Sequence, residues 1–249
     1  MSFSNKVVIV TGASSGIGAA TAVQFAKEGA DVVIVGRKEN KLRNVSEECA
    51  SNGNTPLVIN ADVSNDDDAK RIINETINKF GKIDVLVNNA GISRKGNILN
   101  GTILQAYDNI MAVNIRAVVH LTALAAPHLI ETKGNIVNIS SIAGKSAVLT
   151  DYGAYNISKA ALDHFTRGAA LELSSSGVRV NAISPGPVRT DIIENAGVSD
   201  LSWDILSSLT PLKRCSEPDE IAELVLYLAS EKARGITGSD FVSDNGAIM

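Results

Sequence analysis

The chain has 249 residues, of which 45% are hydrophobic and 20% charged, values that are ordinary for a folded globular protein. A net charge of −4 without a lysine- and arginine-rich tract disfavours nucleic acid and membranes as partners, and we expect no apolar run long enough to cross a bilayer. The two cysteines and three histidines show no disulfide or metal-ligand spacing, and the N-terminus lacks the features of a signal peptide. We therefore expect a cytoplasmic protein with reduced thiols and no metal.

Strands and helices alternate along the chain. Continuous β-branched runs, of the kind buried in a parallel sheet, predict strands at residues 6–11 and 31–36. Further strands are predicted at residues 55–60, 82–87, 134–141, 178–184 and 240–243. Helices are predicted at residues 19–28, 39–52, a segment ending at 80, 105–127, 154–173 and 217–230. This order indicates an α/β fold, a Rossmann-like, doubly wound parallel sheet of about seven strands with helices on both faces. We expect residues 1–249 to form one dinucleotide-binding domain.

A glycine-rich turn, Gly-x-x-x-Gly-x-Gly, joins the first strand to the first helix. Its glycines permit a tight turn in which a pyrophosphate approaches the backbone and the helix N-terminus. The alternative is a turn that binds nothing, but the strand before it and the helix after it favour a dinucleotide site. The predicted cofactor contacts in this turn are Gly12, Ser14, Ser15, Gly16, Ile17 and Gly18.

The end of the second strand bears on the choice of cofactor. An Asp or Glu there would accept hydrogen bonds from the adenosine ribose and select NAD. This chain instead has Gly36, followed by Arg37 and Lys38. Because a guanidinium pairs well with a 2′-phosphate, we predict that NADP(H) is preferred, with NAD(H) as the alternative. Alternatively, Arg37 and Lys38 belong to a solvated basic loop that does not bind the cofactor.

Acidic and amide residues follow the third and fourth strands, at the edge where an open α/β sheet binds its ligand. Asp62, followed by Val63, suits an adenine amino group; alternatively, Asp62 or Ser64 caps the next helix. Amide and small residues at 88–91 can cross-link neighbouring strands and leave room for a cofactor, unless they form a plain turn. The predicted cofactor contacts after these two strands are Asp62, Val63, Asn89, Ala90 and Gly91.

Tyr155 and Lys159 lie four residues apart in a predicted helix, so their side chains leave the same helix face. A neighbouring ammonium favours the phenolate, so we expect Lys159 to lower the pKa of Tyr155 towards useful proton transfer. The alternative is a half-buried tyrosine beside a solvated lysine. Ser140 and Ser141 end the preceding strand, where a hydroxyl can hold a substrate oxygen. A serine hydrolase is disfavoured, since neither a suitably placed histidine nor the nucleophile elbow is present.

Two further stretches are less distinctive by themselves. A lone asparagine within a helix, such as Asn114, is usually a polar surface residue or a local hydrogen-bonding group. Residues 190–209, which contain the single tryptophan, Trp203, are irregular and suit a substrate lid at the mouth of a site.

With these residues assembled, the chain resembles the short-chain dehydrogenase/reductase family, in its compact single-domain branch. The resemblance covers residues 5–246 and rests on six motifs in the family's order and approximate spacing. Each motif is weak alone, but six in order are a strong signal. They are Thr11-Gly-x-x-x-Gly-Ile-Gly18, Asn88-Asn-Ala-Gly91, Asn114, Ser141, Tyr155-x-x-x-Lys159 and Pro185-Gly-Pro-x-x-Thr190.

The resemblance implies a role for each catalytic motif. Tyr155 would be the general acid in reduction and the base in oxidation, while Lys159 would lower its pKa and hold the nicotinamide ribose. Ser141 would orient the substrate oxygen, and Asn114 would hold a water in the proton relay. Ser141 is chosen by analogy with the family's usual second serine, and Ser140 stays open because the loop to Tyr155 is about one residue longer than common.

The resemblance also implies contacts and partners. Pro185, Val188 and Thr190 would lie at the cofactor, with Val188 and Thr190 at the nicotinamide carboxamide. The family usually forms homotetramers through its long helices, so we expect residues 114–130 and 155–175 to be buried between subunits. The expected partner is a small-molecule carbonyl or alcohol substrate.

Two departures from the family's pattern leave alternatives open. Asp244-Asn-Gly246 replaces the usual Asp-Gly-Gly, a change the turn tolerates because asparagine accepts left-handed backbone. Reductases that act on acyl-carrier-protein thioesters usually present basic residues to the carrier, whereas this chain has Glu131-Thr-Lys133 and Ser174-Ser-Ser176 there. The leading expectation is an oxidoreductase for small or medium apolar substrates. The alternatives are a 3-oxoacyl-[acyl-carrier-protein] reductase and a non-catalytic dinucleotide-binding sensor or scaffold.

Overall fold

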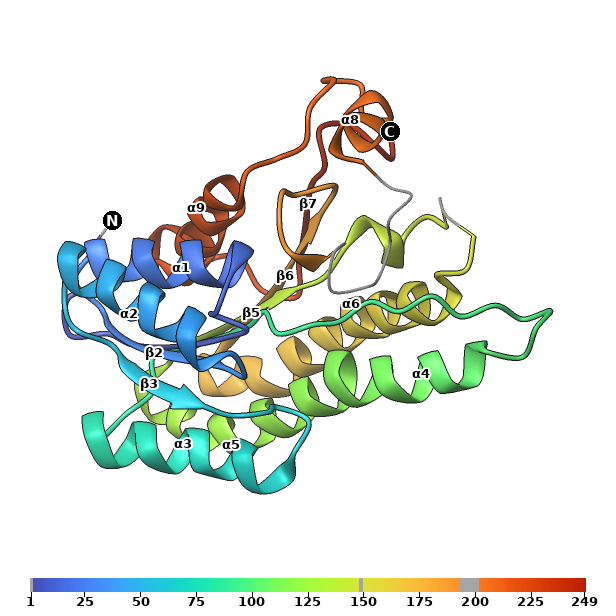
Figure 1. Cartoon of the computed structure of the whole chain (residues 1–249). Helices are drawn as coiled ribbons and strands as arrows, with labels where there is room; N and C mark the ends of the chain where they lie inside the picture. Colours follow the sequence, from blue (N-terminus) through green and yellow to red (C-terminus); the bar gives the residue numbers. More distant parts are fainter. Residues whose placement is uncertain (1, 148–149, 193–201) are drawn as a thin grey trace.

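Seven parallel strands form one sheet in the order β3-β2-β1-β4-β5-β6-β7 (Figure 1). The computed structural model describes residues 2–147, 150–192 and 202–249. After β3 the chain returns to pair β4 with β1, which creates the point where the strand order reverses. The strands are β1 (Val7–Thr11), β2 (Asp31–Gly36), β3 (Leu57–Asn60), β4 (Val85–Asn88), β5 (Asn135–Ile139), β6 (Arg179–Pro185) and β7 (Asp240–Ser243).

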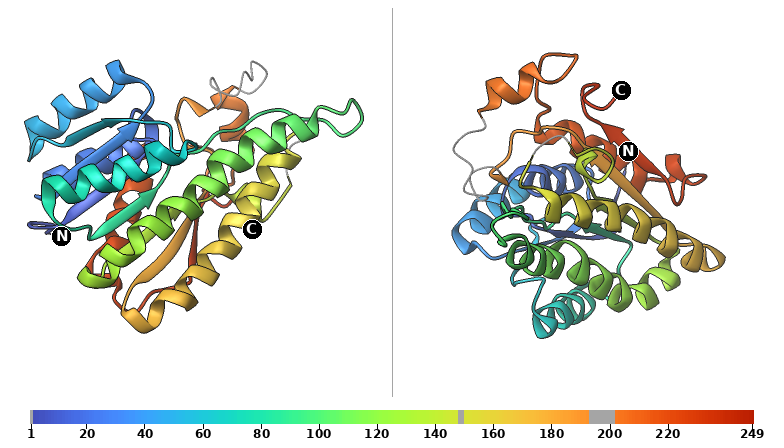
Figure 2. Two further views of the ribbon diagram at one scale, coloured as in Figure 1. Left: turned by 90° about the horizontal axis from the view of Figure 1, so that it is seen from below. Right: turned by 90° about the vertical axis from the view of Figure 1, so that its right-hand side faces the viewer.

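Helices cover both faces of the sheet, which confirms the predicted doubly wound fold (Figures 1 and 2). One face carries α1 (Gly16–Lys27), α2 (Glu39–Asn52) and α9 (Pro218–Ala229). The other face carries α3 (Asp66–Phe80), α5 (Ala117–Thr132) and α6 (Gly153–Leu173), with α4 (Ile103–Met111) beside α6. The shorter elements are η1 (Ala112–Arg116), η2 (Ile142–Gly144), η3 (Ser174–Ser176), α8 (Trp203–Ser208) and η4 (Glu231–Ala233).

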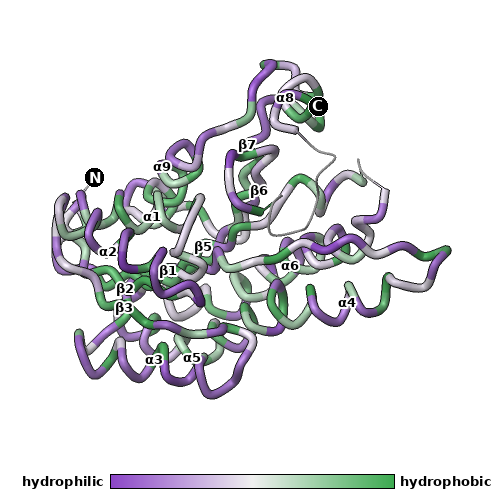
Figure 3. The backbone as a smooth tube through the Cα atoms, viewed as in Figure 1, coloured by the Kyte–Doolittle hydropathy of each residue, from purple (hydrophilic) through white to green (hydrophobic). Residues whose placement is uncertain are grey.

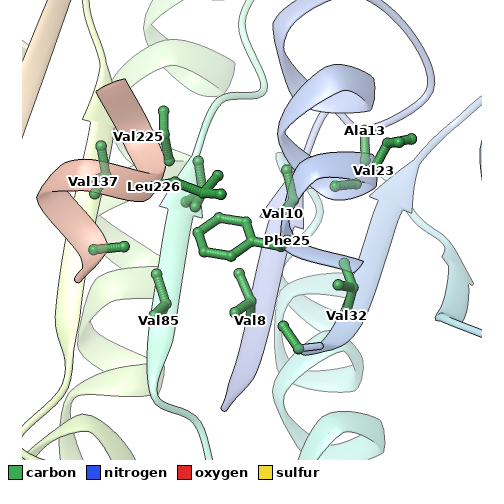
Figure 4. Close-up of a cluster of buried hydrophobic side chains, with 14 of the residues drawn as sticks. Val8, Val10, Ala13, Val23, Phe25, Val32, Val85, Val137, Val225 and Leu226 are labelled. Carbon is green, nitrogen blue, oxygen red and sulfur yellow. The ribbon is translucent and has the colours of Figure 1, made fainter. Parts of the chain in front are cut away.

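The alternation of strand side chains explains why two apolar layers form. Val8 and Val10 of β1 point to the layer under α1 and α9, whereas Val7 and Ile9 point to the layer under α3 and α5. Phe25 of α1 fills the centre of the first layer (Figure 4). Figure 3 shows the consequence along the chain, with hydrophobic strands in the middle and hydrophilic stretches along α2 and α3. The apolar runs of β1 and β2 are buried on both faces as predicted, and β4, β5 and β6 are buried likewise. The edge strands β3 and β7 instead keep exposed positions, Val58 and Val242.

The stretch predicted as helical at residues 105–127 is longer and less uniform than expected. The helix runs from Ile103 to Thr132, passes through Pro127, and contains the π-helical turn η1 at its centre. By length and composition this helix could cross a membrane, contrary to the sequence expectation. Core helices of globular proteins meet the same criterion, and α5 buries Leu121 and Leu129 against the sheet.

Candidate active site

A cavity of about 500 Å³ runs along the carboxyl ends of the first six strands. This is the edge where open α/β sheets bind ligands, and the volume suits a small-molecule site. Residues predicted as cofactor contacts line it after every one of these strands. They are Gly12, Ser14, Ser15, Gly16, Ile17, Arg37, Asp62, Val63, Asn89, Ala90, Gly91, Tyr155, Lys159, Pro185, Val188 and Thr190.

The glycine-rich turn is locked onto the segment that follows β4. The hydroxyl of Thr11 accepts from the backbone amides of Asn89 and Ala90 at 3.0 and 3.1 Å. In return, Asn89 Nδ2 donates to the carbonyl oxygens of Thr11 and Gly12 at 2.8 and 3.2 Å. A Cβ at Gly18 would lie 2.4 Å from both Asn89 Nδ2 and the Gly12 carbonyl oxygen, so this position requires glycine. Gly18 therefore supports the turn from behind and, unlike the other predicted contacts of the turn, does not line the cavity.

Arg37 and Asp62 form a pair at the end of the cavity near β2 and β3. Arg37 Nη1 lies 3.4 Å from Asp62 Oδ2, while Asp62 Oδ1 accepts from the Ser64 hydroxyl at 2.7 Å. Burial raises the pKa of Asp62, but its bonds with Ser64 and the charge of Arg37 together bring that pKa below its ordinary value. Neither Asp62 nor Ser64 caps the next helix. The cap of α3 is Asn65, whose side chain accepts from two amides of the first turn.

Tyr155 leaves the first turn of α6 and is half-buried in the cavity wall. Burial raises the pKa of Tyr155 to about 12, while a hydrogen bond with Ser141 acts to lower it. Lys159 places Nζ 5.6 Å from the Tyr155 ring centroid and donates to the carbonyl oxygen of Ile139 at 2.8 Å. Burial lowers the pKa of Lys159 to about 8, against the opposing charge of Asp163. The expectation of a lowered tyrosine pKa is therefore wrong for this structure, because desolvation dominates the phenol.

Ser140 and Ser141 have different partners. The Ser141 side chain is hydrogen-bonded with Tyr155 and accepts from the backbone amide of Ala143 at 3.1 Å. Ser140 is buried, and its hydroxyl donates to the carboxylate of Asp163. Ser141 is therefore the serine whose hydroxyl meets the phenol, which favours the choice made by analogy.

Asn114 is buried inside η1, so its interpretation as a surface residue is wrong. Its Oδ1 accepts from the amide of Ile92 at 2.8 Å, and its Nδ2 donates to the Ile92 carbonyl oxygen at 2.9 Å. Nδ2 also donates to the Ser158 hydroxyl at 3.1 Å. Asn114 does not line the cavity; it lies behind Gly91, where an added Cβ would be 3.5 Å from its Oδ1.

The segment after β6 is tied to the opposite side of the cavity. Asp191 pairs with Lys41 of α2 and is hydrogen-bonded with Ser15 of the glycine-rich turn. These bonds lower the pKa of Asp191 below its ordinary value. The segment therefore passes over the part of the cavity nearest the predicted pyrophosphate site. Neither Asp191 nor Lys41 was predicted as a site residue, since acidic and basic residues far apart in the sequence give no sign that they pair.

Part of the predicted lid is described. Trp203, Leu206 and Leu209 line the cavity from α8 and the residue after it. The guanidinium of Arg189 lies 5.8 Å from the Trp203 ring centroid and is anchored to Glu217 at 3.2 Å. Residues 193–201 of the lid lie outside the described residues.

A charged cluster behind Tyr155 was also missed. Lys145 lies 2.8 Å from Asp163, which follows Lys159 by four residues. The spacing Tyr155, Lys159, Asp163 repeats along one face of α6 and was a usable signal. Lys145 had no such signal because its partners come from distant segments. Across the described ranges, no three or more His, Cys, Asp or Glu side chains are grouped so as to hold a metal.

Comparison with known proteins agrees with this geometry. The family profile described as Enoyl-(Acyl carrier protein) reductase matches residues 12–247. The 3-oxoacyl-[acyl-carrier-protein] reductase of Staphylococcus epidermidis is 38% identical over 248 residues, which cover 98% of this chain and 100% of that protein. Meso-2,3-butanediol dehydrogenase of Serratia marcescens is 36% identical over 249 residues, 99% of this chain and 96% of that protein.

A solved structure extends the comparison to the fold. The 3-ketoacyl-(acyl-carrier-protein) reductase from Brucella melitensis, complexed with NADH, superposes with a TM-score of 0.90 at 32% identity and covers 100% of both chains. The residues of the cavity are thus set in a fold whose relatives are oxidoreductases. The chain belongs to the short-chain dehydrogenase/reductase family and is a nicotinamide-dependent oxidoreductase that acts on CH–OH groups and carbonyls.

Proposed function

We propose that the protein is an NADP(H)-preferring oxidoreductase that interconverts a carbonyl and a secondary alcohol on a small or medium apolar substrate. The observation that carries the proposal is the hydrogen bond between Ser141 and Tyr155 in the cavity wall, with Lys159 one helical turn behind. This arrangement can bind a substrate oxygen and exchange a proton with it. Residues 1–249 would act as one domain, in the cytoplasm.

The catalytic roles follow from the protonation of these groups. A bound nicotinamide supplies or accepts the hydride. In reduction, Tyr155 donates a proton to the developing alkoxide while the Ser141 hydroxyl orients the substrate oxygen. The raised pKa of Tyr155 keeps the phenol protonated at neutral pH, which suits the acid. In oxidation Tyr155 is the base, and the ammonium of Lys159 stabilises the phenolate that must form.

Asn114 has a supporting role in this scheme. Both hydrogens of its Nδ2 are used by Ile92 and Ser158, and its Oδ1 already accepts one hydrogen bond. These bonds fix the segment after Gly91 that borders Lys159. The water-holding role implied by the family would therefore fall to the remaining Oδ1 lone pair or to the backbone of η1.

The preference for NADP(H) rests on Arg37. Its side chain is 59% exposed at the end of β2, lines the cavity, and follows a glycine in place of a ribose-binding acid. The guanidinium has five donors, of which the bond to Asp62 uses only part. It can therefore hold a 2′-phosphate while Asp62 keeps it in place.

The apolar character of the substrate is supported by large apolar side chains that line part of the cavity. Ile92, Ile142, Trp203, Leu206 and Leu209 line this part of the cavity. Aliphatic and aromatic walls favour the burial of hydrocarbon and leave the reacting oxygen to Ser141 and Tyr155 in the polar corner.

A 3-oxoacyl-[acyl-carrier-protein] reductase is the second candidate, favoured by the Staphylococcus epidermidis relative and the Brucella melitensis structure. Two segments do not favour this candidate. At the end of α5, Glu131 offsets the charge of Lys133, and η3 consists only of serines. An acidic carrier protein would find little positive charge at these two sites. Turnover of a carrier-linked β-ketothioester well above that of free ketones would favour this candidate.

The proposed function is tested by the oxidation of NADPH and NADH over a panel of ketones, diketones, quinones, steroids and a β-ketothioester. We expect turnover with NADPH by the wild type and a loss of about 10³-fold in Tyr155→Phe, because the phenol oxygen carries the proton. Better turnover with NADH would contradict the assignment of Arg37. Tight NADPH binding with no turnover by either protein would favour the non-catalytic sensor.

The proposed assembly is a homotetramer. Val119 and Ile130 of α5 and Ile157 and Leu171 of α6 are large apolar side chains that are 41–81% exposed in the single chain. Burial between subunits would remove this apolar surface from water. A monomeric mass in solution by sedimentation equilibrium would contradict this proposal.

A further inference from the structure

We propose that Lys145, Asp163 and Asp240 are positioning residues, which fix the loop from Ser140 to Lys145 on α6 and place negative charge near Lys159. The proposal depends on the proton-transfer roles given above to Ser141, Tyr155 and Lys159. None of the three proposed residues lines the cavity, so they act only through the groups that do.

Four elements meet at the ammonium of Lys145. Lys145 follows η2, and its Nζ lies 2.8 Å from Asp163 Oδ2 in α6. The same Nζ pairs with Asp240 of β7 and donates to the Ser184 hydroxyl of β6 at 3.1 Å. The side chains of Asp163 and Asp240 are only 7% and 13% exposed. Removing the Lys145 ammonium leaves these two largely buried carboxylates without their shared partner, so the cluster holds η2 against α6 and the sheet.

The second oxygen of Asp163 continues this connection to the reacting groups. Its Oδ1 accepts from the hydroxyl of Ser140, the residue next to Ser141, whose own side chain meets Tyr155. Close packing of Gly144 on α6 reinforces the hydrogen bond between Ser140 and Asp163. A Cβ at Gly144 would lie 2.8 Å from the backbone of α6 and 3.0 Å from Asp163 Oδ2, so the loop is pressed onto the helix. Displacing Lys145 would therefore shift Ser141 relative to Tyr155.

The cluster also places a negative charge near Lys159. One ammonium shared by two carboxylates leaves a net charge of −1, one turn of α6 away from Lys159. The negative charge of Asp163 favours the ammonium form of Lys159 against burial. The titratable and charged groups packed around Lys159 are Tyr155 and Asp163 on α6, with Lys145 and Asp240 behind them. Strand β5 and the π-helical turn present only uncharged groups, the Ile139 carbonyl and Asn114.

Because the cluster acts on Lys159 through charge, Asp163→Asn and Lys145→Met should shift the pH dependence of carbonyl reduction in opposite directions. Asp163→Asn removes a negative charge from the surroundings of Lys159, so the alkaline fall in carbonyl reduction should move to lower pH. Lys145→Met removes a positive charge, so the same fall should move to higher pH, with kcat reduced about tenfold through misplacement of Ser141. Lys145→Arg keeps the charge and should restore both properties.

The experiment measures kcat and KM of NADPH-dependent reduction from pH 5.5 to 10 in these variants, with the melting temperature of each. Lys70→Met is the matched control, because Lys70 pairs with Asp67 on the surface of α3 at 3.2 Å. It should leave kcat and the pH profile unchanged. Shifts in the same direction for Asp163→Asn and Lys145→Met, or a wild-type profile in both, would overturn the proposal.

Two additions separate this proposal from the proposed function. If Lys145→Met does not fold, Asp240→Asn takes its place, and a shift of the alkaline fall to lower pH is then expected. NADPH affinity by titration calorimetry over the same pH range needs no turnover. A fall in affinity that begins at lower pH in Asp163→Asn supports the proposal even if no carbonyl is reduced, and an unchanged pH dependence contradicts it. Loss of turnover in the wild type alone counts only against the proposed function.

Discussion

The two ends of the cavity are held together by different means. At the end formed by β1 and β4, the contacts join backbone amides and carbonyls to one threonine hydroxyl and one asparagine amide, packed around glycines. At the end formed by β5 and β6, hydroxyls and charged side chains from distant segments determine the geometry. A diphosphate needs only donors and close approach, whereas proton transfer needs particular groups with particular pKa values. The first end depends on shape and the second on charge, so they should fail in different ways.

After the loss expected in Tyr155→Phe, the largest effect should come from the serines of the catalytic end, which two separate substitutions distinguish. Ser141→Ala should lower kcat about 10²-fold with little change in melting temperature, because it removes one hydroxyl from the substrate oxygen and from Tyr155. Ser140→Ala should cost only severalfold, since Ser140 bonds to Asp163 behind the site. Steady-state kinetics and thermal melts of both variants check this. A larger loss in Ser140→Ala would reverse the assignment.

At the dinucleotide end, a steric clash should be enough to disturb cofactor binding. In Gly18→Ala, the new Cβ would contact Asn89 Nδ2 and the Gly12 carbonyl oxygen at 2.4 Å, so the turn must shift. We expect a loss of stability of about 2 kcal/mol and weaker binding of NADPH and NADH alike. Gly235→Ala, where nothing lies within 4 Å of the new methyl and the backbone is not left-handed, is the matched control and should be neutral or slightly stabilising. Calorimetric binding and thermal unfolding distinguish the two.

The pH dependence of kcat/KM should differ between reduction and oxidation, which tests the role of charge at the catalytic end. Lys159, whose pKa burial lowers to about 8, loses its proton before Tyr155, whose pKa burial raises to about 12. Reduction needs both protons, so its kcat/KM should be constant below the pKa of Lys159 and fall about tenfold per pH unit above it. Oxidation needs the pair with one proton removed, so its kcat/KM should rise up to the same pH and then level off. Parallel profiles for both directions would contradict this account.

The smallest effect is expected at the adenosine end. Arg37→Gln should weaken NADPH about fivefold and leave NADH unchanged, because the lost guanidinium contact involves only the 2′-phosphate. Arg43→Gln serves as the control, since Arg43 pairs with Glu39 on the exposed face of α2. Equal losses for both cofactors would show that Arg37 supports the loop rather than the phosphate.

The sequence predicted more of the dinucleotide end than of the catalytic end. The glycine spacing and the strand before it are local, so their geometry can be inferred from neighbouring residues. The limits of β2 and β7 agree with the prediction for the same reason. At the catalytic end, residue types were predicted but not their environment. The raised pKa of Tyr155 depends on burial by many segments, which no spacing records.

The cap of α3 and the contacts of Lys145 show the same limit. Asp62, Ser64 and Asn65 all suit an N-cap, and only the backbone geometry selects Asn65. Lys145 finds its partners 18 and 95 residues further along the chain, at positions that the pattern of apolar residues does not relate. Local chemistry was therefore readable, while the choice between equivalent neighbours needed the fold.

The π-helical turn η1 has one more consequence, for the rotation of the helix that contains it. A π-turn adds one residue, which corresponds to about 100° of rotation in an α-helix. The apolar stripe of α4, with Ala106 and Ile110, packs near Tyr155 beside α6, whereas the stripe of α5 packs on the sheet. One continuous helix thus serves two neighbours that lie in different directions. Deleting a single residue from η1 would restore regular hydrogen bonding there but turn one of the two stripes away from its partner.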